Sequence, residues 1–286
     1  MEHTYRLVIS CPDRVGIVAR VSQFVAECGG WLTEASYHSD RDSGWFFMRN
    51  EIRADSLQCG LEEFSAAFAR IAEEYEMRWT IRDSTVRPRV VILASRASHC
   101  LADLLHRWRS NELFCDIPCV ISNHENLREM VEWHNIPFLH VPMPKEPAQK
   151  QQAFAEVERL ITQHDADTIV LARYMQIVPP QLCAQYPGRI INIHHSFLPS
   201  FIGANPYQKA YDRGVKLIGA TSHYVTTELD EGPIIEQDVM RVGHRHSVED
   251  LVRLGKDVEV AVLARALRNH LEDRVIVHGN KTVVFD

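Results

Sequence analysis

Val90-Val-Ile-Leu-Ala94 is the stretch that decides the fold class of the longer part of this chain. An unbroken apolar run of this length, rich in β-branched residues, is typical of a strand that is buried on both faces of a sheet. A second such run lies at 168–171, and apolar residues at helical spacing lie between the two, most clearly over 148–164. Strands that alternate with helices predict an α/β domain with a doubly wound, mostly parallel sheet.

Residues 1–84 follow a different pattern, which predicts a small α+β domain. Segments rich in β-formers lie at 5–10, 31–38, 45–52 and 77–82, and segments with helical spacing lie at 17–25 and 57–75. The predicted order is βαββαβ, which is the ferredoxin-like plan. Residues 85–89 are polar and include a proline, so they form the predicted linker to a second domain over 90–286.

Composition limits the classes of function. The 286 residues carry a net charge of −7, which argues against a nucleic-acid partner. No apolar run is long enough to cross a membrane, and the first residues lack the pattern of a signal peptide. The seven cysteines are scattered, as is typical of reduced thiols, so we expect a cytoplasmic protein. Only Cys115 and Cys119 lie close together, without a second pair of ligands, so we expect no metal site.

The familiar phosphate-binding and nucleophile motifs are missing from the sequence. It has no G-x-x-x-x-G-K, no G-x-G-x-x-G and no G-x-S-x-G, so nothing supports nucleotide binding or esterase activity. Instead, three unusual clusters follow predicted strands, at 171–180, 189–199 and 221–232. Open α/β sheets bind ligands at the carboxyl ends of their strands, so these clusters form the candidate site.

In the cluster at 189–199, an apolar strand becomes polar where it should end. Alternation along a strand places Asn192 and His194 on the same face, so an amide and an imidazole are presented side by side. The cluster at 171–180 is apolar and aromatic, which suits either a buried segment or the wall of a pocket for a flat ligand. Both polar clusters also have an ordinary structural explanation. The polar end of the strand at 189–199 can be satisfied by hydrogen bonds to loop backbone, and the acidic residues of 221–232 can simply be solvated.

Asn192-Ile-His194, followed by Leu229-Asp230-x-Gly232, resembles the signature of the formyltransferases that use 10-formyltetrahydrofolate. The segment 173–178 resembles the folate-binding loop of that family, and the resemblance covers residues 90–286. It implies a folate substrate, no cofactor, no metal ion, and a catalytic set of Asn192, His194 and Asp230. It also implies a folate-binding set, which comprises Met175, Gln176, Ile177, Val178, Gly203, Glu228 and Gly232.

The implied catalytic set suits chemistry at an N-formyl group. Water adds to the formyl carbon, and negative charge develops on the formyl oxygen. Asn192 and His194 are expected to donate hydrogen bonds to that oxygen, and losing one such donor typically costs about 10²–10³ in rate. Asp230 is expected either to accept a proton from the water or to pair with His194 and fix its protonation state.

Residues 5–84 resemble an ACT domain, which is a small-molecule sensing module. The resemblance rests on Asp13-Arg14-Val15-Gly16-Ile17, at the turn between the first strand and the first helix. It implies that these five residues bind an amino-acid effector, since a helix N-terminus readily accepts a carboxylate. The alternative is a domain that serves only to assemble a homo-oligomer.

The two parts in this order resemble the deformylases of the formyltransferase family, which hydrolyse 10-formyltetrahydrofolate to tetrahydrofolate and formate. Two departures from the related glycinamide ribonucleotide transformylases support the hydrolase. The loop Ser95-Arg-Ala-Ser-His-Cys100 lacks the glycines that hold a substrate phosphate, and His195 and Phe197 replace a proline and a leucine on the acceptor side. Two alternatives stay open: a formyltransferase with an amine acceptor, and a non-catalytic regulator that binds folate or an amino acid.

Overall fold

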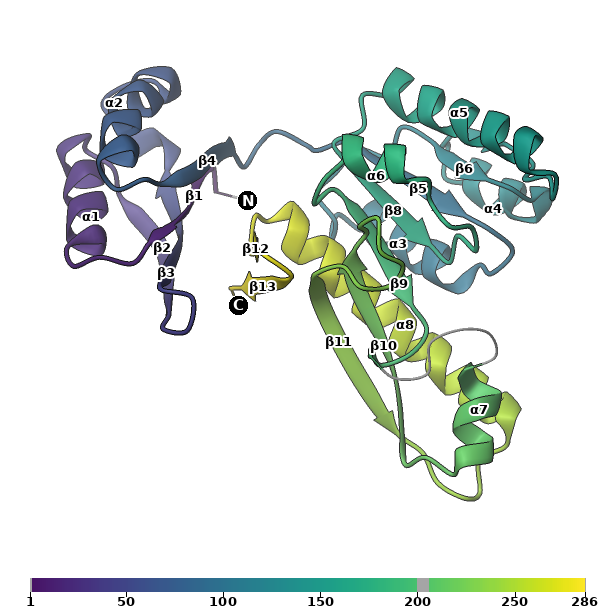
Figure 1. Cartoon of the computed structure of the whole chain (residues 1–286). Coiled ribbons are helices and arrows are strands. Elements are labelled where there is room, and N and C mark those ends of the chain that lie inside the picture. Colours follow the sequence, from purple (N-terminus) through teal and green to yellow (C-terminus); the bar gives the residue numbers. More distant parts are fainter. Residues whose placement is uncertain (1, 200–205, 286) are drawn as a thin grey trace. The chain divides into compact units, whose positions relative to one another are not determined.

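The computed structural model describes residues 2–199 and 206–285, and the chain forms two compact units (Figure 1). The first unit comprises Met1–Arg87, Glu272–His278 and Val283–Asp286, and the second comprises Pro88–Leu271 and Gly279–Thr282. The sequence pattern assigns everything after residue 90 to one domain. In the structure, the C-terminal segments Glu272–His278 and Val283–Asp286 group with the first unit instead.

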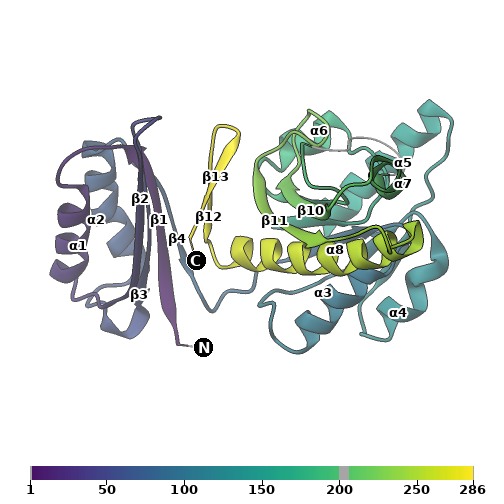
Figure 2. The same cartoon turned by 90° about the horizontal axis from the view of Figure 1, so that it is seen from below.

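The first unit is built around a four-stranded antiparallel sheet in the order β2-β3-β1-β4. Its elements are β1 (Thr4–Pro12), α1 (Ile17–Glu27), β2 (Leu32–Asp40), β3 (Trp45–Arg53), a 3-10 turn (Ala54–Ser56), α2 (Leu61–Glu74) and β4 (Arg78–Asp83). This is the βαββαβ order that the sequence predicts. Both helices lie on one face of the sheet (Figure 2), where Phe24 of α1 packs on Phe64 and Phe68 of α2.

The other face of this sheet packs against the C-terminal segments of the chain. Those segments form a two-stranded sheet of β12 (Val275–His278) and β13 (Lys281–Val284). Ile276 and Phe285 form an apolar cluster with Phe47 of β3. Because side chains alternate along a strand, Phe47 faces this cluster while its neighbour Phe46 belongs to the core under the helices.

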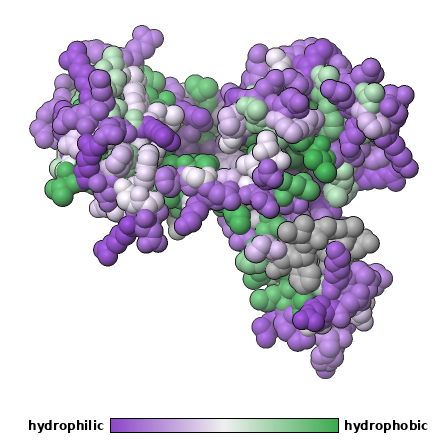
Figure 3. All heavy atoms as spheres, in the orientation of Figure 1, coloured by the Kyte–Doolittle hydropathy of each residue, from purple (hydrophilic) through white to green (hydrophobic). Residues whose placement is uncertain are grey.

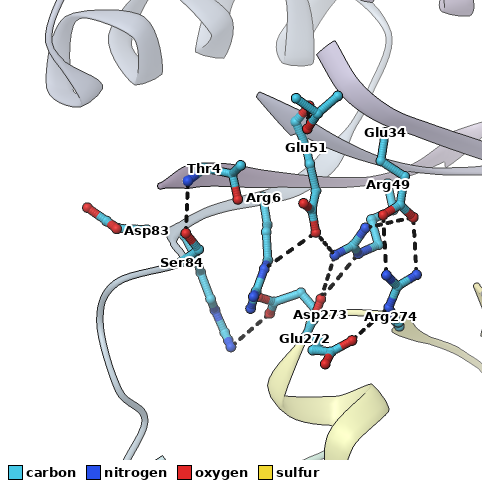
Figure 4. Close-up of polar contacts among 12 residues, drawn as sticks. Thr4, Arg6, Glu34, Arg49, Glu51, Asp83, Ser84, Glu272, Asp273 and Arg274 are labelled. Atoms are coloured by element: carbon cyan, nitrogen blue, oxygen red, sulfur yellow. Dashed lines mark hydrogen bonds and ion pairs between the residues drawn. The ribbon is translucent and has the colours of Figure 1, made fainter. Parts of the chain in front are cut away.

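A cluster of ion pairs also ties the C-terminal segment to the first unit (Figure 4). The side chain of Arg49 is fully buried and lies 3.0 Å from the carboxylate of Glu34. Its Nη2 donates to the backbone oxygen of Glu272 over 2.9 Å. Asp273 lies 3.0 Å from Arg82 of β4. A buried charge is tolerated only with such partners, so the segment after residue 271 is part of the fold of the first unit.

The second unit contains a seven-stranded sheet in the order β11-β10-β9-β8-β5-β6-β7. The strands are β5 (Val90–Ala94), β6 (Val120–Ser122), β7 (Phe138–His140), β8 (Thr168–Ala172), β9 (Ile190–His194), β10 (Leu217–Tyr224) and β11 (Ile234–Arg241). The helices are α3 (His99–Arg109), α4 (Arg128–Glu132), α5 (Pro147–Gln163), α6 (Pro180–Gln185), α7 (Pro206–Arg213) and α8 (Val248–Leu271), with a 3-10 turn at Glu125–Leu127. The strands from β9 to β7 are parallel, and β10 and β11 run antiparallel. The predicted mostly parallel sheet is therefore confirmed.

Helices cover both faces of this sheet (Figure 2). Phe154 of α5 and Leu182 of α6 belong to the core on one face, while α3 and α8 contact each other on the opposite face. The direction in which strands are added reverses between β5 and β8. The strands β6 and β7 follow on one side of β5, and β8, β9, β10 and β11 follow on the other side. Such a switch point is where α/β sheets bind ligands, beyond the carboxyl ends of the strands.

The surface is mainly hydrophilic in the view of Figure 3. Among the described residues, no helix combines the length and the apolar character that crossing a membrane requires. A few large apolar side chains are exposed nonetheless, and Met175 and Ile177 are two of them. Their position after β8 places them beside the switch point.

Candidate active site

A cavity of about 940 Å³ opens at the carboxyl ends of β5, β8 and β9. Its walls come from the segments 173–178, 192–195 and 225–230, and from α8. The three clusters that the sequence singles out therefore meet at the switch point of the sheet. All residues of the lining belong to the second unit.

The structure brings Asn192, His194 and Asp230 together in this cavity, as the sequence predicts. Asn192 and His194 lie on β9 with one residue between them, so both side chains are on the same face of the strand. Asp230 comes from the loop after β10, and its Oδ2 lies 3.3 Å from Nδ1 of His194. His194 is buried, and no described residue provides a hydrogen-bond partner for its Nε2. A buried polar atom of this kind is usually satisfied by a ligand or by water.

His223 is a fourth member of the group, which the sequence analysis did not single out. It lies on β10 directly across from Asn192 of β9. Its Nδ1 donates to the backbone oxygen of Tyr224 over 3.0 Å, so its Nε2 can accept from Nδ2 of Asn192 over 3.2 Å. Nε2 also lies 3.7 Å from Oδ1 of Asp230. His223 thereby fixes the orientation of the Asn192 amide, which faces the cavity beside Asp230.

The two histidines determine the charge state of Asp230. The contact with His194, and next the contact with His223, hold the pKa of the Asp230 carboxyl well below its usual range, although burial opposes this. The residue also has a left-handed backbone with φ of 57°, a conformation that aspartate tolerates better than most residues. Asp230 is therefore a fixed carboxylate ion between two imidazole rings.

The loop after β8 forms the apolar part of the wall. Tyr174 and Val178 are buried beneath it, while Met175 and Ile177 are 58% and 64% exposed. The loop is attached to the end of β5, because the Met175 N–H donates to Oγ of Ser95 over 3.0 Å. Exposed apolar side chains at the edge of a cavity suit a flat, partly apolar ligand.

The other predicted folate-binding residues differ in their placement. Gln176 and Glu228 line the cavity. Gly232 is not among the described residues of the lining; a Cβ at this position would lie 1.8 Å from the backbone oxygen of Tyr224. Because Gly232 has no side chain, its backbone can lie close to the backbone of Tyr224. Gly203 lies outside the described residues.

Glu259 of α8 is the centre of a second polar group in the same cavity. Its side chain is 1% exposed, and it accepts a hydrogen bond from Nε2 of His99 and another from Tyr207 Oη, each over 2.7 Å. Nε of Arg173 lies 3.4 Å from Oε2. Burial raises the pKa of Glu259, but His99, Arg173 and Tyr207 outweigh it and hold that pKa below its usual value. Glu259 is therefore a buried carboxylate ion that is fully engaged.

A metal site at this group is not supported by its contacts. The ligand atoms of His99, Cys100 and Glu259 lie within 4.8 Å of one another. However, the carboxylate oxygens of Glu259 already accept from His99 and Tyr207, and the Arg173 guanidinium stands beside them. Burial also raises the pKa of the Cys100 thiol far above neutral pH, so it stays protonated. The group is a hydrogen-bonded network.

The N-terminal candidate site lies in the first unit, where β1 ends and α1 begins. Gly16 precedes α1 with φ of 97°, which glycine adopts easily. Ser39 Oγ donates to the carboxylate of Asp13, Arg14 pairs with Glu76, and Val15 is fully exposed. Asp13, Arg14, Val15, Gly16 and Ile17 thus form one turn, although Ile17 is buried in the core.

Sequence and structure comparisons agree with this site. A sequence profile of the family described as Formyl transferase matches residues 88–267, so the chain belongs to the formyl transferase family. A crystal structure of glycinamide ribonucleotide transformylase 1 from Symbiobacterium toebii has a TM-score of 0.66 and 30% identity, over 70% of this chain and 95% of that one.

The match to one branch of the family extends over nearly the whole chain. A formyltetrahydrofolate deformylase of Bacillus subtilis (strain 168) is 51% identical over 98% of this chain and 93% of the relative. A crystal structure of a formyltetrahydrofolate deformylase from Pseudomonas syringae pv. tomato str. DC3000 has 67% identity and a TM-score of 0.97, covering 100% of this chain and 95% of that one. The chain is a member of the formyltetrahydrofolate deformylase family, which confirms the resemblance seen in the sequence.

Proposed function

We infer that this chain hydrolyses 10-formyltetrahydrofolate to tetrahydrofolate and formate. The observation that carries the inference is the full-length match to deformylases, combined with Asn192, His194 and Asp230 meeting in one cavity. The experiment supplies the purified chain with 10-formyltetrahydrofolate and no amine acceptor. Equal release of formate and tetrahydrofolate supports the hydrolase, whereas binding without release favours a transferase or a non-catalytic regulator.

We propose that Asn192 and His194 stabilise the negative charge on the formyl oxygen. When water adds to the formyl carbon, the free amide hydrogen of Asn192 and Nε2–H of His194 are the donors available in the cavity. Asp230 accepts from Nδ1 of His194 and so holds the ring in a fixed orientation beside Asn192. Of the two roles considered for Asp230, its depressed pKa supports pairing with His194, since such a carboxylate is a weak base. This chemistry needs no metal ion or cofactor, and we propose none.

We propose that the loop after β8 holds the pteridine ring, with Met175, Gln176, Ile177 and Val178 on one side and Glu228 on the other. Gly203 and Gly232 complete the folate-binding set by family resemblance, and for Gly232 the structure supports a packing role instead. A flat heterocycle would cover Met175 and Ile177, which are exposed in the free enzyme. Burial of such side chains would contribute to the binding of substrate.

Ile177→Ala should raise the KM for 10-formyltetrahydrofolate about three- to tenfold, because the variant loses roughly 1 kcal/mol of apolar contact. The kcat should change little, since Ile177 does not touch the formyl group in this arrangement. Val239→Ala is the matched control, because Val239 is an exposed apolar residue on β11, outside the cavity lining. An unchanged KM in Ile177→Ala would place the pteridine elsewhere.

We propose that the first unit is an ACT domain of ferredoxin-like topology, which binds an amino acid at Asp13–Ile17. The first turn of α1 has backbone N–H groups without intrahelical partners, which suits a carboxylate, and Gly16 leaves room beside them. Calorimetric titration with glycine, serine and methionine tests this proposal. Absence of heat and of any rate change with all three would leave assembly of a homo-oligomer as the function of the unit.

We also propose a cytoplasmic location for the enzyme. All seven cysteines are free thiols, which suits a reducing compartment.

A further inference from the structure

We propose that His195 is the general base that takes a proton from the attacking water. The proposal rests on the hydrolysis inferred above and assigns a residue that the Asn192, His194 and Asp230 set leaves without a role. Hydrolysis needs a group that accepts the water proton as the oxygen bonds to the formyl carbon. The placement of His195 and the contacts of its neighbours identify it as that group.

His195 is the residue after the last position of β9, and its ring lines the cavity beside His194. The two rings are stacked, with centroids 5.2 Å apart and planes 30° apart. The centroid of the Tyr207 ring lies 6.3 Å from that of His195. Within the described residues, no side-chain hydrogen bond engages either ring nitrogen of His195. A partly buried imidazole with free nitrogens thus stands next to the group that would hold the formyl oxygen.

Three groups close to His195 in the cavity, Asp230, Glu259 and His194, are already engaged. Asp230 contacts His194 through one oxygen and His223 through the other, and its pKa is depressed. Glu259 accepts hydrogen bonds from His99 and Tyr207 on separate oxygens. His194 donates from Nδ1 to Asp230, and its Nε2 is needed as a donor to the formyl oxygen. His195 has no such engagement with a described side chain, so a ring nitrogen of His195 suits proton transfer.

The surroundings of His195 keep it neutral at physiological pH. Burial, followed by the positive charges of Arg173 and His194, lowers the pKa of His195 to about 4, while Glu259 and Asp230 oppose the shift. The groups that face it come from several elements: Arg173 after β8, His194 on β9, Tyr207 on α7, Asp230 after β10 and Glu259 on α8. A histidine with this pKa carries a free lone pair at any pH well above 4.

His195 accepts a proton in the first half of the reaction and returns it in the second half. The water oxygen bonds to the formyl carbon as one O–H bond breaks, and that proton moves to a ring nitrogen of His195. The electron pair of the C=O π bond moves to the formyl oxygen, which Asn192 and His194 hold. When the intermediate collapses, the electron pair on the formyl oxygen re-forms the C=O bond and the C–N bond breaks. The electron pair of the C–N bond goes to the leaving nitrogen, and the proton on His195 is delivered there. The second proton of the water leaves with the acid product, which ionises to formate.

His195→Ala should lower kcat about 10²–10³-fold with KM changed less than about threefold, because a general base acts in the transition state. Added imidazole should restore part of the rate in this variant and leave the wild type unchanged. The wild-type kcat/KM should fall as pH drops through about 4, where His195 becomes protonated, and the variant should lack this dependence. His140→Ala is the control, because His140 lies on β7 and pairs with Glu125, outside this cavity.

His195→Asn tests the same proposal with less change in volume, and thermal unfolding of both variants shows whether they fold. A folded His195→Ala or His195→Asn that retains a rate within about threefold of the wild type overturns the proposal. So does a slow variant that imidazole does not rescue and that keeps the wild-type pH dependence. Failure of the wild type to release formate would instead remove the proposed function itself.

Discussion

His194→Ala is expected to lower kcat by about 10³, the largest effect of any single substitution in this site. The change removes a donor to the formyl oxygen and also the imidazole that lies 3.3 Å from the Asp230 carboxylate. Formate release from 10-formyltetrahydrofolate, measured under single-turnover conditions, separates this loss from slow product release. His244→Ala is a matched control, since His244 is an exposed histidine outside the cavity.

The KM of His194→Ala distinguishes two explanations for such a loss. An interaction made only in the transition state lowers kcat and kcat/KM equally, so KM should stay close to that of the wild type. A variant that binds substrate poorly and reacts at the normal rate once saturated would assign His194 to binding. A folded variant with near wild-type turnover would remove His194 from the catalytic set altogether.

Asp230→Asn is expected to lower kcat by about 10²–10³, because an amide lacks the negative charge that pairs with His194. The substitution preserves shape, so substrate affinity should change little. Activity is measured across neutral pH, where Asp230 is ionised in the wild type. A variant rate equal to that of the wild type would show that the pairing of Asp230 with His194 does not contribute to catalysis.

Stability provides an independent test of Asp230. The folded chain depresses the pKa of this carboxyl, so the charge stabilises the fold at pH values above the ordinary pKa of about 4. That contribution is lost as pH falls through the folded value. The difference in unfolding free energy between the wild type and Asp230→Asn should therefore be largest near neutral pH and should shrink with acid. A difference that does not change with pH would contradict the ion pair.

Much of the fold follows from local pattern in the sequence. The unbroken apolar strands predict the parallel sheet, and alternation predicts that Asn192 and His194 share a face. The helix start at Ser247 is also predictable, since Ser247 and Asp250 form a reciprocal pair of hydrogen bonds over 3.0 and 3.2 Å at the beginning of α8. Each of these features depends on residues within a few positions of one another.

The residues that the sequence analysis missed depend on distant neighbours. His223 becomes significant only when β10 pairs antiparallel with β9 and brings it opposite Asn192. Glu259 looks like one more polar residue of a long helix until His99 and Tyr207 are placed around it. In the same way, Arg49 reads as an exposed strand residue, although it is buried against a backbone oxygen more than 200 positions later in the chain. No local periodicity carries such information.

The segments after residue 271 cover one face of the sheet of the first unit. This C-terminal cover has a consequence for synthesis on the ribosome. The residues that face it, such as Phe47 and Arg49, are made early, and roughly 180 residues of the second unit follow before the cover itself. At about 5–20 residues per second, the nascent chain waits roughly 10–40 s with this surface open. Residues that are translated after the second unit thus complete the first unit. A chain that terminates before Glu272 therefore leaves the apolar and charged surface around Phe47 and Arg49 uncovered, which chaperones and proteases can recognise.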